Sequence, residues 1–275
     1  MIFKTAFIET IEDSIHMLPF LFVAFLLIEF LEKHTSEKTN EMLKKAKKAG
    51  PILGAIVGCV PQCGFSIMAA NLYAGGVVSL GTLISVWIST SDEALLILLG
   101  NKGQLHSVLK IIIVKVIFGI IFGYLVDFII AKFIESPKES GVLCVDCGCE
   151  ESGNIFMPAL RHTVKLFLYL VVLTFLLNVV LDLIGTDGMS KLLLGKTYFE
   201  PLITGIIGAI PNCTASVLLM QMYILKIITF PSVIAGLTMN SGLGMLTLFR
   251  ENKNRKENIK IVVLLYGISC LIGFI

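Results

Sequence analysis

The sequence has few charged residues. Asp, Glu, Lys and Arg make up 15% of the 275 residues, whereas hydrophobic residues make up 56%. One soluble core could not bury so much apolar sequence, so the composition excludes an ordinary soluble domain and indicates an integral membrane protein. The chain also lacks a P-loop pattern and a soluble domain of useful size. Energy for any transport would therefore come from an ion gradient or a partner protein.

The first apolar run lacks the marks of a signal peptide. Glu9, Glu12 and Asp13 precede it where a basic region would be expected, and no small-residue cleavage site follows it. We therefore interpret this run as a retained membrane helix.

Apolar segments long enough for a helix to cross the hydrocarbon layer, about 20 residues, recur along the chain. The eight segments are 14–31, 51–74, 77–99, 107–134, 163–185, 201–222, 224–249 and 258–275. They are continuous and do not alternate as the strands of a membrane barrel do. The sequence therefore predicts an all-α polytopic membrane protein.

One motif occurs twice within these segments. GAIVGCVPQCGFS begins at Gly54, and GIIGAIPNCTAS begins at Gly205. An offset of 150 residues superimposes Gly58 on Gly208, Pro61 on Pro211, Gln62 on Asn212, Cys63 on Cys213 and Ser66 on Ser216. We interpret the chain as two membrane repeats, 1–134 and 163–275, joined by a linker at 135–162.

Loop charges predict how the repeats are oriented, because cytoplasmic loops are rich in Lys and Arg. The loops 33–48 and 250–260 are strongly basic, whereas 100–106 and 186–200 are poorly basic. The 150-residue offset pairs each basic loop with a poorly basic one. The two repeats are therefore predicted to have inverted topology.

Inversion requires an odd number of crossings per half, but each half has four apolar segments. Proline and glycine at each motif weaken the helix. We therefore expect 51–74 and 201–222 to be re-entrant hairpins whose polar tips reach the middle of the membrane. Ten shorter spans, five per half, are the alternative.

Paired breaks in inverted halves point to a transporter's substrate site, although Gly and Pro can also simply permit close helix packing. The polar groups at these breaks are neutral or soft. We predict a substrate site formed by Cys63 and Cys213 with Gln62, Asn212, Ser66 and Ser216. Thiols favour a soft cargo. Cys59 is a further metal-binding candidate, although a lone membrane cysteine is usually a small buried hydrophobe.

A second set of polar residues follows each break. Ser91 and Ser241 are equivalent, and Asp92 directly follows Ser91. Because charges deep in the membrane normally face a cavity, Asp92 is predicted to bind substrate or to carry protons. The other interpretation places it near the outer helix end. Glu29 is a second candidate for proton coupling, against an interfacial or helix-pairing role.

The linker contains a cysteine-rich stretch, CVDCGCEE, with Cys144, Cys147 and Cys149. Three closely spaced thiols can bind one soft metal. The predicted topology places them in the reducing cytoplasm, where structural disulfides are disfavoured. A flexible linker without metal is the other interpretation.

GCVPQCGFS, GAIPNCTAS and the linker thiols together resemble the ArsP-like permeases, a family of heavy-metal exporters described as arsenic efflux proteins or manganese transporters. The resemblance implies a polytopic permease of the inner membrane that exports a toxic metal or metalloid. Where the family description says manganese, the cysteines favour a softer cargo.

We therefore predict a secondary exporter, not an enzyme, that moves a soft metal ion or trivalent arsenical by alternating access without a resident cofactor. A Mn(II) exporter using oxygen ligands from Asp92, Asn212 and Asn240 is the alternative. A membrane thiol oxidoreductase is less favoured, because neither break contains a C-x-x-C pair. The expected partners are the cargo and the lipid bilayer, not nucleic acid, and a homo-oligomer stays an open option.

Overall fold

The structure is a computed structural model that describes residues 18–19, 22–23, 26, 49–60, 63–90, 95, 105–130, 156–157, 159–161, 163–165, 167–169, 171–172, 175–176, 179 and 199–275. The described part of the chain is helical and contains no strand. The predicted all-α class is therefore confirmed for these residues.

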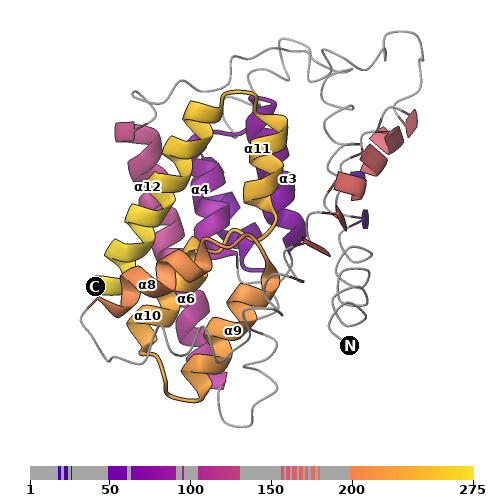
Figure 1. Cartoon of the computed structure of the whole chain (residues 1–275). Helices are drawn as coiled ribbons and strands as arrows, with labels where there is room; N and C mark the ends of the chain where they lie inside the picture. Colours follow the sequence, from indigo (N-terminus) through magenta and orange to yellow (C-terminus); the bar gives the residue numbers. More distant parts are fainter. Residues whose placement is uncertain are drawn as a thin grey trace.

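Most of the described helical residues form two series (Figure 1). The first comprises a helix at Ala49–Gly58, then α3 (Cys63–Ala74), α4 (Leu80–Ser89), α6 (Leu105–Leu125) and a π-helical turn η1 (Val126–Ile130). The second comprises α8 (Glu200–Gly208), α9 (Cys213–Ile224), α10 (Phe230–Met239), α11 (Gly244–Glu251) and α12 (Arg255–Phe274).

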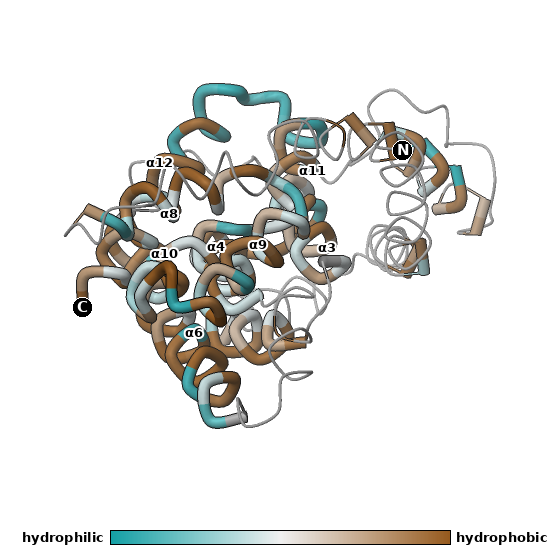
Figure 2. Tube along the Cα trace, turned by 60° about the horizontal axis from the view of Figure 1, so that its bottom comes forward, coloured by the Kyte–Doolittle hydropathy of each residue, from teal (hydrophilic) through white to brown (hydrophobic). Residues whose placement is uncertain are grey.

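Three helical stretches in the described residues are long and apolar enough to cross a membrane, namely His106–Ile129, Phe230–Glu251 and Arg255–Phe274. On α6 the side chains of Ile113, Ile117 and Ile121 are all at least half exposed. Their spacing of four residues forms an outward apolar stripe. Figure 2 shows the same hydrophobic character along most helices, whereas the connection between α11 and α12 is hydrophilic. These features fit a multi-pass membrane protein.

Both motifs interrupt helices, as expected from their proline and glycine residues. The helix at 49–58 ends before α3 begins at Cys63, and α8 ends at Gly208 before α9 begins at Cys213. The arms are 9 to 12 residues long, or about 14–18 Å at 1.5 Å per residue. Each arm is therefore about half the length needed to cross the hydrocarbon layer.

The two arms of the first motif run in opposite directions. Gly50 faces the Thr82 side chain and Gly58 faces the last turn of α4, so the first arm is parallel to α4. Trp87 Nε1 near the end of α4 donates to Ser66 O near the start of α3, at 3.3 Å, so α3 is antiparallel to α4. The segment 49–74 is therefore a helical hairpin.

The second series repeats this packing. A Cβ on Gly58 would lie 2.7 Å from Val86 O, and a Cβ on Gly208 would overlap Gly236 O at the equivalent position. These glycines are needed because the first arm of each hairpin lies directly against the helix that follows the hairpin, α4 or α10. Close helix packing, the alternative role considered for these glycines, is therefore also present.

The last helix of each series returns to the start of the hairpin. A Cβ on Gly123 would lie 2.8 Å from Pro51 Cβ and 2.9 Å from Gly81 O. A Cβ on the equivalent Gly273 would lie 2.9 Å from Pro201 Cβ and 3.1 Å from Pro231 O. The end of α6 therefore packs against the start of the first arm and the start of α4, and the end of α12 packs against the equivalent α8 and α10.

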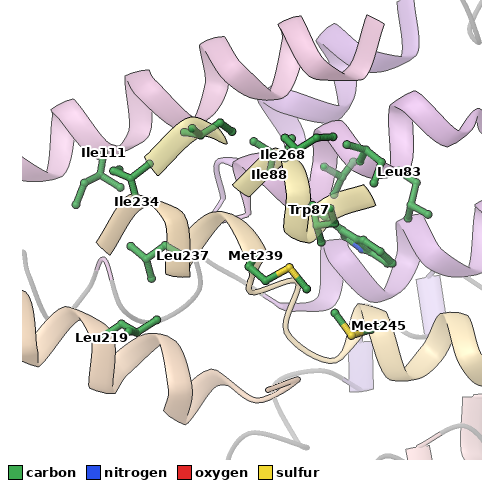
Figure 3. Packing of buried hydrophobic residues seen from close by; sticks show 14 of the residues in the cluster. Leu83, Trp87, Ile88, Ile111, Leu219, Ile234, Leu237, Met239, Met245 and Ile268 are labelled. Carbon is green, nitrogen blue, oxygen red and sulfur yellow. The ribbon is translucent and has the colours of Figure 1, made fainter. Parts of the chain in front are cut away.

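Contacts between the series join α3 to α11, which lie side by side in Figure 1. A Cβ on Gly244 would lie 2.7 Å from Ser66 O. Tyr73 OH donates to Glu257 Oε1 at 2.6 Å, and both residues are buried. One hydrophobic cluster contains residues of both series, including Trp87 of α4, Ile111 of α6 and Leu237 of α10 (Figure 3).

The apolar run 224–249 contains an interruption that its hydropathy does not indicate. It is long enough to cross a membrane, as predicted, but α10 ends at Met239 and α11 begins at Gly244. Asn240 caps the end of α10 and accepts a hydrogen bond from Gly242 N at 2.7 Å, while Gly242 adopts φ 54°. The left-handed glycine and the competing side-chain hydrogen bond interrupt the helix.

Candidate substrate site at the helix breaks

The second motif and the α10–α11 break are joined by one side chain. Asn240 Nδ2 donates to Asn212 O at 3.1 Å, while Asn240 Oδ1 accepts from Gly242 N. Asn212 is the N-cap of α9, and its Oδ1 accepts from Thr214 N at 3.4 Å. Both asparagines are buried. Two interruptions separated in sequence therefore form one polar junction.

Cys213 lies at the start of α9 beside this junction. It is 3% exposed and belongs to an apolar cluster with Ile67 of α3 and Leu243. Ser216 Oγ donates to Cys213 O at 2.7 Å. The predicted pair Cys213 and Ser216 is therefore brought together, and a residue of the first hairpin is in the same cluster.

Two hydroxyl groups near the junction are buried without a hydrogen-bond partner in the described part of the structure. They are Ser241 Oγ in the α10–α11 break and Thr238 Oγ1 in the last turn of α10. Buried polar groups are normally paired. Ser241 was predicted as a substrate residue, whereas Thr238 was not.

Other predicted site residues are only partly described. Ser66 is buried in α3, and its carbonyl accepts from Trp87. Cys63 begins α3, but its side chain lies outside the described residues. The predicted residues Gln62, Ser91, Asp92, Glu29, Cys144, Cys147 and Cys149 also lie outside the described residues.

Cys59 follows the first arm and is half-buried. Its Sγ donates to Ala55 O at 3.1 Å, four residues earlier. This contact fits a small residue at a helix end, the alternative considered for Cys59. Among the residues that the structure describes, no group of three or more His, Cys, Asp and Glu side chains could hold a metal ion.

A buried lysine lies where α4 and α10 end. Lys115, in the middle of α6, is 1% exposed. Its Nζ donates to Thr90 O, the C-cap residue of α4, and to Leu237 O in the last turn of α10, the latter at 2.9 Å. Carbonyls at helix C-termini carry partial negative charge and favour a cation.

Comparison with known sequences identifies the family of this chain. Residues 3–183 match the family ArsP_2, described as "Putative, 10TM heavy-metal exporter". The chain belongs to this family. None of the curated proteins or solved structures compared with the chain matches it.

The ArsP_2 description counts ten membrane segments. In the described residues, the structure divides each of the two motif segments into two helices. Family membership makes the chain a membrane protein of a metal-exporter family, as the composition and the motifs predicted.

Sequence reasoning missed several buried polar residues of this ArsP_2 member. Lys115 could have been found as a charge inside an apolar run, because such charges are rare and usually functional. Glu200, which accepts from Thr229 Oγ1 at 2.9 Å, directly precedes a predicted membrane segment and gave no comparable signal. Thr238 also gave none, since a lone threonine is ordinary in a membrane helix.

Proposed function

We propose that this protein is a secondary exporter of a soft metal ion or trivalent arsenical and that its substrate site lies at the helix breaks. The junction of Asn212 and Asn240, with Cys213 beside it, carries the proposal. It joins the second hairpin to the break between α10 and α11 and lies next to a thiol. Broken helices with free backbone groups and small polar side chains are how many transporters bind their cargo.

The proposal includes two inverted repeats with alternating access between them. Equivalent contacts at an offset of 150 residues support the duplication, notably Gly58 with Gly208 and Gly123 with Gly273. The hydroxyl pair Ser79–Thr82 also recurs as Thr229–Ser232, with both oxygen–oxygen distances 2.8 Å.

The direction of the helices supports inversion. Each hairpin opens toward the end of its series where its last helix finishes, as the glycine contacts of α6 and α12 indicate. The Tyr73–Glu257 hydrogen bond joins the open end of the first hairpin to the start of α12. The open end of the second hairpin instead lies beside the end of α12. Inverted repeats would have this arrangement, with related elements of the two halves pointing in opposite directions.

The same hydrogen bond supports the proposed orientation in the inner membrane. It brings the open end of the first hairpin near the basic stretch that begins at Arg250. Arg250 Nη1 in turn donates to Lys165 O at 3.0 Å, shortly after the linker at 135–162. We propose that these segments lie on the cytoplasmic side, because that side is rich in Lys and Arg.

We propose that Cys63 and Cys213 bind the cargo from the two halves, with Ser241 and the asparagines completing the site. Thiolate ligands select soft ions. The linker thiols of Cys144, Cys147 and Cys149 would capture cargo before its transfer to the membrane site. In this proposal the protein has no resident cofactor and performs no covalent chemistry.

One observation favours the second candidate, a Mn(II) exporter. The described groups at the junction mostly offer oxygen ligands. They are the Asn240 amide oxygen, the Asn212 carbonyl oxygen and the Ser241 hydroxyl, which has no hydrogen-bond partner among the described residues. Manganese prefers such oxygen ligands. The thiol of Cys213 would then serve only to pack against Ile67 and Leu243.

Transport into everted membrane vesicles tests the proposal. Vesicles containing the full chain would be assayed for uptake of As(III), Cd(II), Zn(II) and Mn(II), against vesicles lacking it. Uptake of As(III) or Cd(II) above Mn(II) supports the thiol site. Uptake of Mn(II) alone favours the oxygen-ligand alternative, and uptake of none of the four overturns both.

A further inference from the structure

Lys115 occupies a position that no part of the proposed cargo site uses. It lies ten residues from each end of α6, and its side chain is almost completely buried. A charged side chain is costly at membrane depth and usually marks a pathway for ions or protons. Such a residue needs a functional explanation.

Two hydrogen bonds that Lys115 donates join the two halves of the protein. Thr90 belongs to the first half and ends α4, whereas Leu237 belongs to the second half and lies in the last turn of α10. These helices are equivalent at the 150-residue offset. One ammonium group thus holds together the C-terminal ends of two equivalent helices, α4 and α10.

The repeat provides an internal comparison for this position. The residue equivalent to Lys115 is Leu265 of α12, which is fully buried in the hydrophobic cluster. The framework therefore accepts an apolar side chain at this place in one half. Lys115 is an addition to the shared framework, which argues against a purely structural need for charge here.

Within the described part of the chain, the elements packed against α6 carry few titratable groups near Lys115. The sequences of α4 and α10 contain none. Cys59, after the helix at 49–58, is within electrostatic range of Lys115. Asp127 in η1 is three turns away and accepts from Ser79 Oγ and Gly81 N, both at 2.7 Å. Asp92 and Glu93 follow Thr90 in sequence and lie outside the described residues.

We propose that Lys115 is the proton-coupling residue of transport, an inference that rests on the proposed export function. The protonated ammonium holds the ends of α4 and α10 together in the arrangement seen here. When it loses its proton to water, the neutral amine makes weaker hydrogen bonds, because charge-assisted bonds are about twice as strong as neutral ones.

This change would bias a two-state element of the fold. With the amine neutral, the ends of α4 and α10 can separate and the halves can rearrange around the cargo. Reprotonation from the other side restores the tie after the cargo leaves. One proton then crosses the membrane in the direction opposite to each exported cargo particle, and no other reactant is needed. Asp92, if it carries protons as predicted from the sequence, would add to this number.

Two substitutions separate coupling from structure. Lys115→Met removes the titrating group and the tie, whereas Lys115→Arg keeps a cation that does not lose its proton at physiological pH. Lys110→Met is the matched control, because Lys110 is exposed on the same helix. Everted vesicles would be assayed for As(III) and Cd(II) uptake with and without a pH gradient, and for exchange of labelled cargo at equal concentrations.

For the wild type and Lys110→Met, we expect uptake that rises at least tenfold with an inside-acid gradient. Lys115→Met should retain exchange within about threefold of the wild type but lose the response to the gradient. Lys115→Arg should lose both, since the tie stays closed. A structural tether predicts the reverse order, with Arg nearly normal and Met inactive, and that result would overturn the inference.

The failure of this inference can be distinguished from failure of the proposed function. A wild type that transports none of the cargos refutes the export function itself. A wild type that transports cargo at the same rate with and without the gradient refutes only the role of Lys115. If Lys115→Met does not accumulate as folded protein, this wild-type comparison and the Arg variant still decide the question.

Discussion

Gly76 and Lys226 lie 150 residues apart and both adopt left-handed backbone, with φ 73° and 59°. Each follows the second arm of a hairpin, and its N–H donates to a tyrosine carbonyl three residues earlier, Tyr73 O at 2.9 Å and Tyr223 O at 3.0 Å. A conformation that glycine adopts freely is thus kept in the second half by a residue with a side chain.

Replacement of Lys226 by glycine should stabilise the protein. A residue with a Cβ in this region costs about 1–2 kcal/mol, so Lys226→Gly should unfold at a higher temperature in detergent. Lys226→Ala retains the Cβ and serves as the control for loss of the charged side chain. Equal unfolding temperatures for the glycine and alanine variants would contradict the prediction.

The glycine at the end of α8 should not tolerate a side chain. A Cβ on Gly208 would overlap Gly236 O, a backbone atom that cannot move without shifting α10. Gly208→Ala should cost about 1–3 kcal/mol, as overpacking usually does, and should also lower transport. Thermal unfolding and vesicle uptake would measure both effects.

Gly267 in α12 provides the matched control for this substitution. A Cβ there has nothing within 4 Å, so Gly267→Ala should be neutral or slightly stabilising, since alanine favours helix over glycine by about 1 kcal/mol. A Gly208→Ala protein as stable and active as Gly267→Ala would show that the close packing of α8 on α10 is not required.

Asn240 should be needed for the geometry of the junction. Asn240→Asp keeps an acceptor for Gly242 N but loses the donor to Asn212 O. Asn240→Leu loses both and leaves a buried N–H unpaired, at a cost of about 1–3 kcal/mol. We expect uptake to fall in the order wild type, Asp, Leu. Wild-type uptake by the leucine variant would show that the junction is not part of the substrate site.

The Tyr73–Glu257 hydrogen bond should hold the two halves together on the proposed cytoplasmic side. Tyr73→Phe removes the donor to a buried carboxylate, and a hydrogen bond to a charged group contributes about 1.5–3 kcal/mol. The variant should show faster hydrogen exchange at the start of α12. Tyr266→Phe is the control, because Tyr266 OH donates to Leu202 O within the second half, at 3.1 Å. Similar exchange at this site in both variants would contradict the prediction.

Much of the fold could be predicted because apolar run length, proline and glycine are local signals. Pro211 and Gly208 indicated where α8 ends, and the structure places the interruption there. The break at Asn240 was missed, since it depends on side-chain hydrogen bonds inside a run that is apolar throughout. Hydropathy alone cannot detect such an interruption.

The site was predictable only where residues share a motif. Asn212, Cys213 and Ser216 were found together because they follow one proline, and the structure keeps them together. Lys115 and Thr238 come close to the helix breaks only because helices distant in sequence pack together. Their proximity to the breaks is a tertiary property that spacing along the chain cannot reveal.

The proposed substrate site requires that equivalent thiols at the two breaks bind a soft cargo. Its most direct test is As(III) uptake into everted vesicles by the wild type, Cys63→Ala, Cys213→Ala and Cys270→Ala, with Cys270 as a buried thiol of α12 outside the motifs. We expect at least tenfold lower uptake for the first two variants and wild-type uptake for Cys270→Ala. Full uptake by both Cys63→Ala and Cys213→Ala would contradict the claim.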